Sequence, residues 1–214
     1  MSNRLIVSKT RQLMALALLL IVGCSYASAA VDKVTSSTQL TLDTPSRAYP
    51  VATLLDVGIP TLNDGLYLTD EDDTVFPEVR YAEAIYFSNQ LGKVLEKSGA
   101  WGAIRVTPSD DVIMDLYISG TIYQSDGETL DLEITARDSS GTKWFSQRYK
   151  QTTGKYAYDR RLKSLGDPFQ NLFIRIANDL LNYREKTISD QRAEELRTIS
   201  ELRFAKQFSP EAFD

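Results

Sequence analysis

Residues 114–149 carry the strongest local pattern of the chain, two alternating runs of apolar and polar side chains followed by an aromatic run. The first two runs are joined by a turn that contains Asp126-Gly127, and the second is followed by a turn that ends in Gly141. Glycine takes the positive φ of a tight turn at no steric cost, so this arrangement predicts β-hairpins. We expect an antiparallel three-stranded meander with one apolar and one polar face.

Two apolar stripes at helical spacing flank the meander. The first predicts a helix over 78–98, with Pro77 at its start and Gly99 just after its end. The second predicts a helix that opens at Asp167-Pro168. The stripes consist of Ala84, Phe87, Leu91, Val94 and Leu95, and of Phe169, Leu172, Phe173, Ile176, Leu180 and Tyr183.

Shorter segments complete the predicted fold. Residues 51–57 indicate a buried strand closed by Gly58, residues 103–106 indicate a short strand, and 58–77 indicate a loop. Both helices can cover the apolar face of the meander, which gives an α/β (α+β) two-layer sandwich over 51–186. Its mainly antiparallel sheet keeps an uncovered polar face. Trp101 and Trp144 are expected in the core. Residues 187–214 predict a helical tail with a narrow apolar seam.

The first fifty residues indicate export. Three basic residues precede an apolar run from Leu13 to Val22, which is too short to span a membrane and is typical of a signal peptide over 1–23. The run ends in Ile21-Val22-Gly23-Cys24, which resembles the lipobox of bacterial lipoproteins. The resemblance implies lipidation of Cys24 and cleavage before it. Residues 24–50 lack regular periodicity and predict a flexible tether.

The lipoprotein interpretation has one rival at the N-terminus. Ala27-Ser28-Ala29 is a site of the kind that ordinary signal peptidase cuts, which would remove Cys24 and release a soluble protein. In lipoproteins the residue after the lipidated cysteine influences which membrane keeps the protein. An Asp there would favour the inner membrane, whereas this chain has Ser25. The resemblance therefore implies the periplasmic face of the outer membrane.

Composition excludes several classes of site. The chain has 214 residues, no histidine and one cysteine, so a zinc finger, a Ser–His–Asp triad and an intrachain disulfide are excluded. It has 24 basic and 29 acidic residues, and loss of 1–23 removes only basic ones. An acidic mature chain disfavours binding to a phosphate backbone, so no nucleic-acid partner is expected. We also expect no metal and no cofactor.

Two short motifs carry a resemblance to a known kind of domain. They are Leu95-Glu96-Lys97-Ser98-Gly99 at a helix end and Asp115-Leu116-Tyr117-Ile118-Ser119-Gly120 in a strand. With the lipidated tether they are similar to the amino-terminal domain of TolB, to CsgG and to LpoB, over about residues 50–185. The resemblance implies a non-enzymatic envelope protein: a docking module, an activator or a pore. Residues 142–166 lack the alternation of a barrel hairpin, which disfavours a pore.

Several residues are candidates for a contact surface or an active site. Tyr117 and Tyr123 are expected on the polar sheet face, where aromatic side chains favour interfaces. The loop residues Tyr156, Tyr158, Arg160 and Arg161 could contact an envelope protein or peptidoglycan. The alternative function is a carboxylate-based hydrolase of peptidoglycan or another glycan. Its candidate acids are Asp115, Asp131 and Glu133, which would then have to line a cleft.

Overall fold

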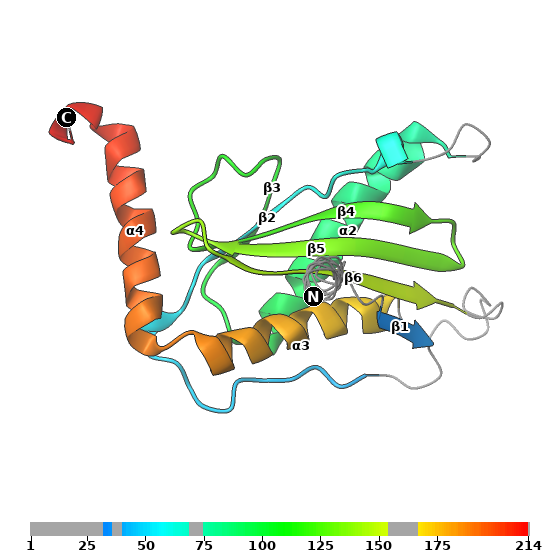
Figure 1. Ribbon diagram of the computed structural model, residues 1–214, viewed down its shortest axis with the longest axis horizontal. Coiled ribbons are helices and arrows are strands. Elements are labelled where there is room, and N and C mark those ends of the chain that lie inside the picture. The colour runs from blue at the N-terminus through cyan, green and yellow to red at the C-terminus, as the bar shows by residue number, and fades with distance from the viewer. Residues whose placement is uncertain (1–31, 36–39, 69–74, 154–166, 214) are drawn as a thin grey trace, which may run out of the picture. The chain divides into compact units, whose positions relative to one another are not determined.

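The computed structural model describes residues 32–35, 40–68, 75–153 and 167–213 (Figure 1). Within these residues the strands form one mixed sheet of six in the order β1-β6-β5-β4-β2-β3. The strands are β1 (Asp32–Thr35), β2 (Val57–Pro60), β3 (Ile104–Thr107), β4 (Leu116–Ser125), β5 (Thr129–Asp138) and β6 (Lys143–Thr152). Helices cover one face of the sheet, so the predicted two-layer α/β arrangement is confirmed.

The meander is present as predicted. Strands β4, β5 and β6 are antiparallel, with Ile118 opposite Ala136 and Leu132 opposite Tyr149 on the core side. Gly127 has φ 83° in the β4–β5 turn, a value that side chains with a Cβ rarely adopt. The alternation in the sequence therefore places one set of side chains in the core and the other on the opposite face.

The first strand was predicted too early in the chain. Residues Val51–Thr53 form a short 3₁₀ helix, η1, and the strand begins only at Val57. Both the backbone N–H and the hydroxyl of Thr53 donate to the Pro50 carbonyl at 2.9 Å, so this threonine closes a turn instead of joining a ladder. Strand β2 lies between β3 and the start of β4, parallel to both.

The two predicted helices form the second layer. Helix α2 (Pro77–Ser98) matches its prediction and ends at Gly99, whose φ of 66° is the left-handed cap conformation. Helix α3 (Gln170–Thr187) starts slightly later than predicted, because the Asp167 carboxylate accepts the Phe169 N–H at 2.7 Å just ahead of the first turn. The helices pack on each other and on the sheet through their apolar stripes.

Aromatic rings occupy the core between the two layers. Phe87 of α2 and Phe173 of α3 have ring centroids 6.1 Å apart. Trp144 stacks on Tyr183 at 5.0 Å and lies 6.4 Å from Trp101. Both tryptophans are buried, which confirms their expected place in the core.

The expectation of an unstructured tether up to residue 50 is wrong for the described part of that segment. Strand β1 pairs in parallel with β6 at an edge of the sheet. Residues 40–47 then lie along α3: the Leu40 and Asp43 N–H groups donate to Asn171 and Asn178, each at 2.9 Å. Polar side chains of α3 hold this backbone, and Leu40 and Leu42 pack against the core. The alternation of two leucines is too short to have predicted this packing from the sequence.

Helix α4 (Asp190–Phe208) packs only through its first half. Ser189 caps it by accepting the Arg192 N–H at 3.1 Å. Arg197 donates to the Leu54 carbonyl at 2.7 Å, and Ser200 donates to the Asp115 carboxylate. From Glu201 through the short helix η4 (Pro210–Ala212) every residue is exposed. Among the described residues, no helix has the length and hydrophobicity needed to cross a bilayer.

Candidate functional site

The polar face of the sheet carries a charged cluster centred on Asp131 of β5. Its side chain is only 1% exposed, and both carboxylate oxygens accept hydrogen bonds from Arg148 of β6, at 2.7 and 3.1 Å. The Lys150 ammonium lies 3.3 Å from the same carboxylate. Cross-strand register explains the cluster, since β5 places Asp131 opposite Lys150 and diagonal to Arg148.

Tyr123 of β4 extends this cluster towards the end of the strand. Its hydroxyl donates to Glu133 at 2.8 Å, and the Arg148 guanidinium lies 4.0 Å from the centre of its ring. The hydrogen bond to Glu133 raises the pKa of the Tyr123 hydroxyl. The hydrogen bond to Asp131 likewise raises the pKa of Arg148. Carboxylates on β5 therefore hold both the Tyr123 side chain and the Arg148 guanidinium in place.

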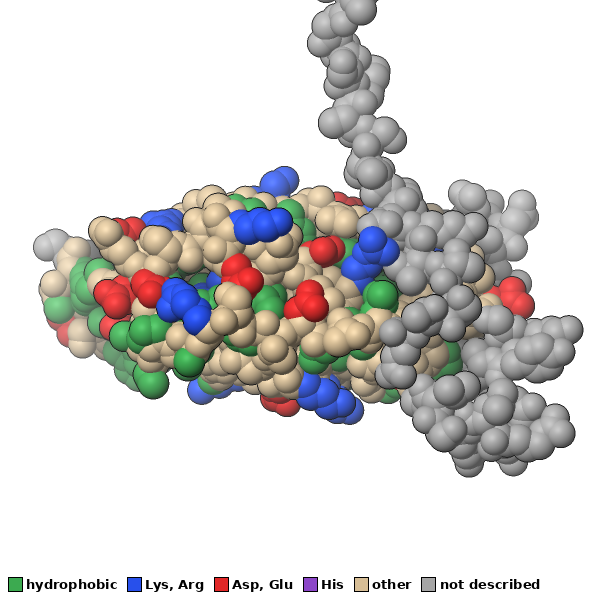
Figure 2. Space-filling model, turned by 90° about the horizontal axis from the view of Figure 1, so that it is seen from below, with side chains coloured by type: hydrophobic (Ala, Val, Ile, Leu, Met, Phe, Trp, Pro, Cys, Tyr) green, Lys and Arg blue, Asp and Glu red, His purple; other side chains and the backbone are tan. Residues whose placement is uncertain are grey.

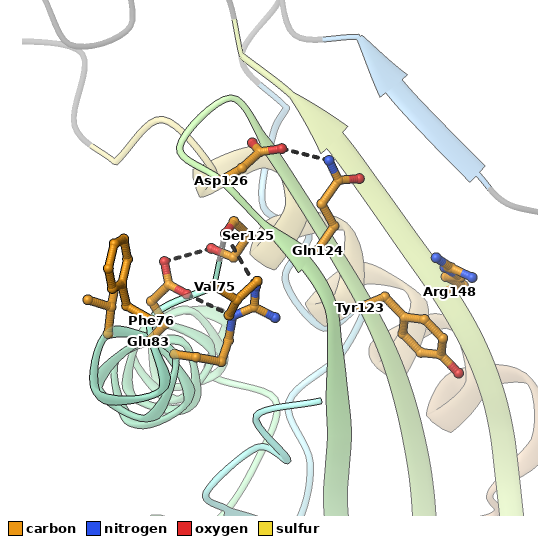
Figure 3. A pocket seen from close by; sticks show the side chains of 10 residues that line it. Val75, Phe76, Glu83, Tyr123, Gln124, Ser125, Asp126 and Arg148 are labelled. Atoms are coloured by element: carbon orange, nitrogen blue, oxygen red, sulfur yellow. Dashed lines mark hydrogen bonds and ion pairs between the residues drawn. The ribbon is translucent and has the colours of Figure 1, made fainter. Parts of the chain in front are cut away.

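A groove with a volume of about 620 Å³ lies beside Tyr123, between the start of α2 and the end of β4 (Figure 3). The described residues that line it are Val75, Phe76, Val79, Arg80, Glu83, Tyr123, Gln124, Ser125, Asp126 and Arg148. Glu83 accepts a hydrogen bond from Ser125 at 2.7 Å and pairs with Arg80 at 3.3 Å. The polar wall is thus internally paired, whereas Phe76 and Val79 present exposed apolar surface.

The structure separates the residues that the sequence grouped as contact candidates. Tyr117 and Tyr123 point to the same sheet face, but only Tyr123 lines the groove. The Tyr117 hydroxyl accepts the Met114 N–H at 2.9 Å near the other end of β4. The remaining candidates, Tyr156, Tyr158, Arg160 and Arg161, lie outside the described residues, as does the lipidation candidate Cys24.

The three carboxylates considered for hydrolysis do not meet in the groove. Asp131 and Glu133 are bound as described above, and neither is among the residues that line the groove. Asp115 is buried at the opposite end of β4, where it accepts hydrogen bonds from the Asp56 N–H and from Ser200. The described geometry gives no specific support to a catalytic pair. Nor does it bring together three Cys, Asp or Glu residues that could hold a metal, within the part of the chain it covers.

Asp115 gives a test of pH dependence. Burial raises the pKa of its carboxyl above the ordinary value, and the hydrogen bonds from Ser200 and Asp56 offset this only in part. The folded chain then holds this proton more tightly than the unfolded chain, so the contribution of Asp115 to stability falls as the pH rises through the interval between the two pKa values. We expect Asp115→Asn to remove that fall. The free energy of unfolding of the variant, relative to wild type, should increase from about pH 4 upwards in urea titrations.

Asp126 supplies a control of opposite sign. Burial raises the pKa of Asp126, but hydrogen bonds from the Thr129 N–H, Gln124 and the Glu128 N–H together lower it below the ordinary value. Its contribution to stability is therefore present above the unfolded pKa and is lost as the pH falls. Relative to wild type, Asp126→Asn should lose stability as the pH rises. If the stability difference from wild type changes with pH in the same direction for both variants, at least one of the two assignments is wrong.

Sequence reasoning missed the exposed apolar residues at the two ends of the folded unit. Phe76 and Val79 at the start of α2 are 63% and 55% exposed, and Phe208 at the end of α4 is 73% exposed. Figure 2 shows hydrophobic side chains on the surface at the end that carries α4. Phe204 and Phe208 were not included in the predicted seam of the tail, although their four-residue spacing was the available signal.

Comparison with known proteins found distant similarity of fold. No family model matches the sequence, and the search of curated proteins found no significant match. The hypothetical protein CT253 from Chlamydia trachomatis is similar over 60% of this chain and 96% of its own, with 12% identity and a TM-score of 0.38. A PelC variant, solved as a dodecamer and from Paraburkholderia phytofirmans, is similar over 68% and 88%, with 13% identity and a TM-score of 0.33.

A third solved structure is the lipoprotein GNA1162 from Neisseria meningitidis. It is similar over 63% of this chain and 99% of its own, with 10% identity and a TM-score of 0.24. These three distant similarities concern the fold alone and assign no function to this chain. The resemblance to TolB, CsgG and LpoB stays a prediction.

Proposed function

We propose that this chain is an outer-membrane lipoprotein that faces the periplasm and acts as a non-catalytic docking or assembly module of the bacterial envelope. Its sequence supplies the export signal and the lipobox-like segment that ends in Cys24. One lipid chain binds a bilayer only reversibly, whereas two or more anchor a protein stably. A lipoprotein cysteine carries more than one acyl chain, so a lipidated Cys24 would anchor the protein stably.

The observation that carries the docking role is the contrast between satisfied polar groups and open apolar surface. Asp131, Glu133, Tyr123 and Arg148 bind one another on the sheet face. Large apolar side chains are instead exposed at the two ends of the folded unit, and aromatic anchors of this kind dominate binding interfaces. This pattern favours a protein-binding role over a catalytic one.

The length of chain between Cys24 and the first strand limits how far a lipid anchor could lie from that strand. Strand β1 begins at Asp32, eight residues after Cys24. Even a fully extended chain of this length spans at most about 28 Å. A lipid on Cys24 would therefore keep the start of β1 within this distance of the membrane surface.

Lipidation can be tested directly. Cells that produce the full chain from its own leader are labelled with palmitate, and wild type is compared with Cys24→Ser. We expect wild type to carry label and to fractionate with the outer membrane, and Cys24→Ser to carry none. Ser25→Ala is the matched control and should keep the label. Equal labelling of all three chains, or a wild-type product that begins at Ala30, would overturn the proposed anchor.

A further inference from the structure

The terminal part of α4 and the residues after it form an exposed apolar arm, which we define as residues 201–213. The stripe that packs the first half of α4 consists of Ala193, Leu196 and Ser200. Phe204 and Phe208 continue this stripe at four-residue steps beyond the last packed residue, and are 54% and 73% exposed. The helix face that is packed in the first half of α4 thus carries large apolar side chains in the second half, where it is exposed.

The arm presents a compact aromatic surface. The rings of Phe204 and Phe208 lie 4.7 Å apart, and Phe213 follows after η4 with 43% of its surface exposed. Between the two phenylalanines Lys206 adds a positive charge, and Arg203 adds another just before them. The two acidic residues of the arm, Glu201 and Glu211, lie at its ends, and none occurs from Leu202 to Pro210. The basic residues therefore lie next to the two phenylalanine rings, and the carboxylates lie further away at the ends of the arm.

The groove between α2 and β4 has complementary properties. Phe76 and Val79 form its exposed apolar edge. The exposed charges beside it are acidic: Glu78 in the first turn of α2, and Asp126 and Glu128 in the β4–β5 turn. The positive charges of the two arginines in the groove wall are offset by carboxylates. Arg80 is nearly buried and pairs with Glu83, and Arg148 is held by Asp131.

The arm cannot reach the groove of its own chain. Strand β4 separates them: Asp115, just before its first residue, contacts α4, and its last residue, Ser125, lines the groove. Ten residues of strand span about 33 Å. In Figure 1 α4 lies at one end of the folded unit 31–214, and the start of α2 lies at the other.

We propose that the arm of one copy docks in the α2–β4 groove of a second copy, with Phe204 and Phe208 against Phe76 and Val79 and with Arg203 and Lys206 beside the acidic rim. The contact is head-to-tail, so each copy uses one arm and one groove, and repetition produces a ring or a filament. The inference deepens the proposed docking function by naming a second copy as the partner. It does not depend on lipidation of Cys24.

Cross-linking between tagged copies tests the contact in the full chain. One copy carries Phe208→Cys, the other carries Val79→Cys, and both are produced from their own leader. The introduced thiol is the only free one whether Cys24 is lipidated or removed, and chains without an introduced cysteine give the background. A short bismaleimide should link this pair at least several-fold more than the control pair Phe208→Cys with Lys97→Cys, since Lys97 is exposed at the far end of α2.

The outcomes of this experiment are distinct. Preferential linking of position 208 to position 79 supports the head-to-tail contact. Equal linking to position 97, linking mainly between two copies of Phe208→Cys, or no linking above background overturns it. Loss of palmitate label with preserved 208–79 linking would remove the proposed anchor and leave the contact between copies standing.

Mixing of variants provides a second measurement. Phe204→Ser with Phe208→Ser disables the arm, and Phe76→Ser with Val79→Ser disables the groove. All four side chains are more than half exposed, so both variants should keep the thermal midpoint of a single folded chain. In sedimentation of the full chain, wild type should associate beyond the dimer, and each variant alone should be monomeric. Their mixture should stop at a one-to-one dimer, because only one functional arm and one functional groove remain. Association of either variant alone would overturn the proposal.

Discussion

Phe173→Ala is expected to lower the free energy of unfolding by about 3–5 kcal/mol, the largest effect of any single substitution proposed for this chain. Phe173 is fully buried in α3, where its ring faces Phe87 of α2. Truncation removes the transfer free energy of the ring and leaves a cavity at the contact between both helices and the sheet. Close-packed layers relax only in part around such a cavity, so most of this loss should be measured.

Urea unfolding followed by tryptophan fluorescence measures this loss, because Trp101 and Trp144 lie in the same core. Phe204→Ala is the matched control: it deletes the same atoms at a site on the exposed arm and should change stability by less than about 0.5 kcal/mol at a protein concentration where copies do not associate. The loss of unfolding free energy for Phe173→Leu should lie between those of Phe173→Ala and Phe204→Ala. Equal losses for Phe173→Ala and Phe204→Ala would show that the two-layer packing described above is incorrect.

The sequence predicted those elements whose own side chains determine their structure. Alternation specified the meander, and the stripe ending at Gly99 specified α2 almost to the residue. Helical spacing likewise placed Phe173 in the core. In each case the signal is local, because a period of two or 3.6 residues directly decides which side chains share a face.

Elements held largely by distant polar groups gave a much weaker signal. The backbone of Leu40 and Asp43 is bound by Asn171 and Asn178, more than 130 residues away in the sequence. The strand expected over 51–57 has the right hydrophobicity, but the hydroxyl of Thr53 closes a turn at Pro50. Neither interaction changes the hydropathy pattern, so the sequence could not reveal either one.

The candidate site shows the same division. Tyr123 was identified because alternation puts it on the polar face, and the structure places it in the wall of the groove. The groove itself depends on how α2 crosses the end of β4, which no spacing in the sequence records. Asp131 was considered as a possible acid, whereas its partner Arg148 became visible only once β5 and β6 were in register.

Asp138→Ala is expected to lower the free energy of unfolding by about 2–4 kcal/mol. Asp138 is buried at the end of β5, in a turn that the sequence predicted. One carboxylate oxygen accepts the backbone N–H groups of Ser140 and Thr142, at 3.0 and 3.1 Å. The other accepts the indole N–H of Trp144 at 3.1 Å and lies 3.8 Å from Arg192 of α4. Alanine leaves the buried indole N–H of Trp144 without its acceptor, which costs more than the hydrogen bond itself contributes, and it also removes the acceptor that closes the turn at the exposed residues Ser140 and Thr142.

Asp138→Asn and Arg192→Ala separate the parts of this effect. The asparagine keeps one acceptor for the turn but presents its NH₂ group to Trp144, so we expect an intermediate loss of stability. Arg192 is about one-third exposed, so its removal should cost less than about 1 kcal/mol. Because the same carboxylate binds the turn, the core and the first turn of α4, Asp138→Ala should also accelerate hydrogen exchange at Ala193 and Leu196. If exchange there stays at the wild-type rate, α4 is held by Arg197, by the hydrogen bond from Ser200 to Asp115 and by the Ser139 hydroxyl, which donates to the Leu196 carbonyl at 2.7 Å, and the orientation of the arm does not depend on Asp138.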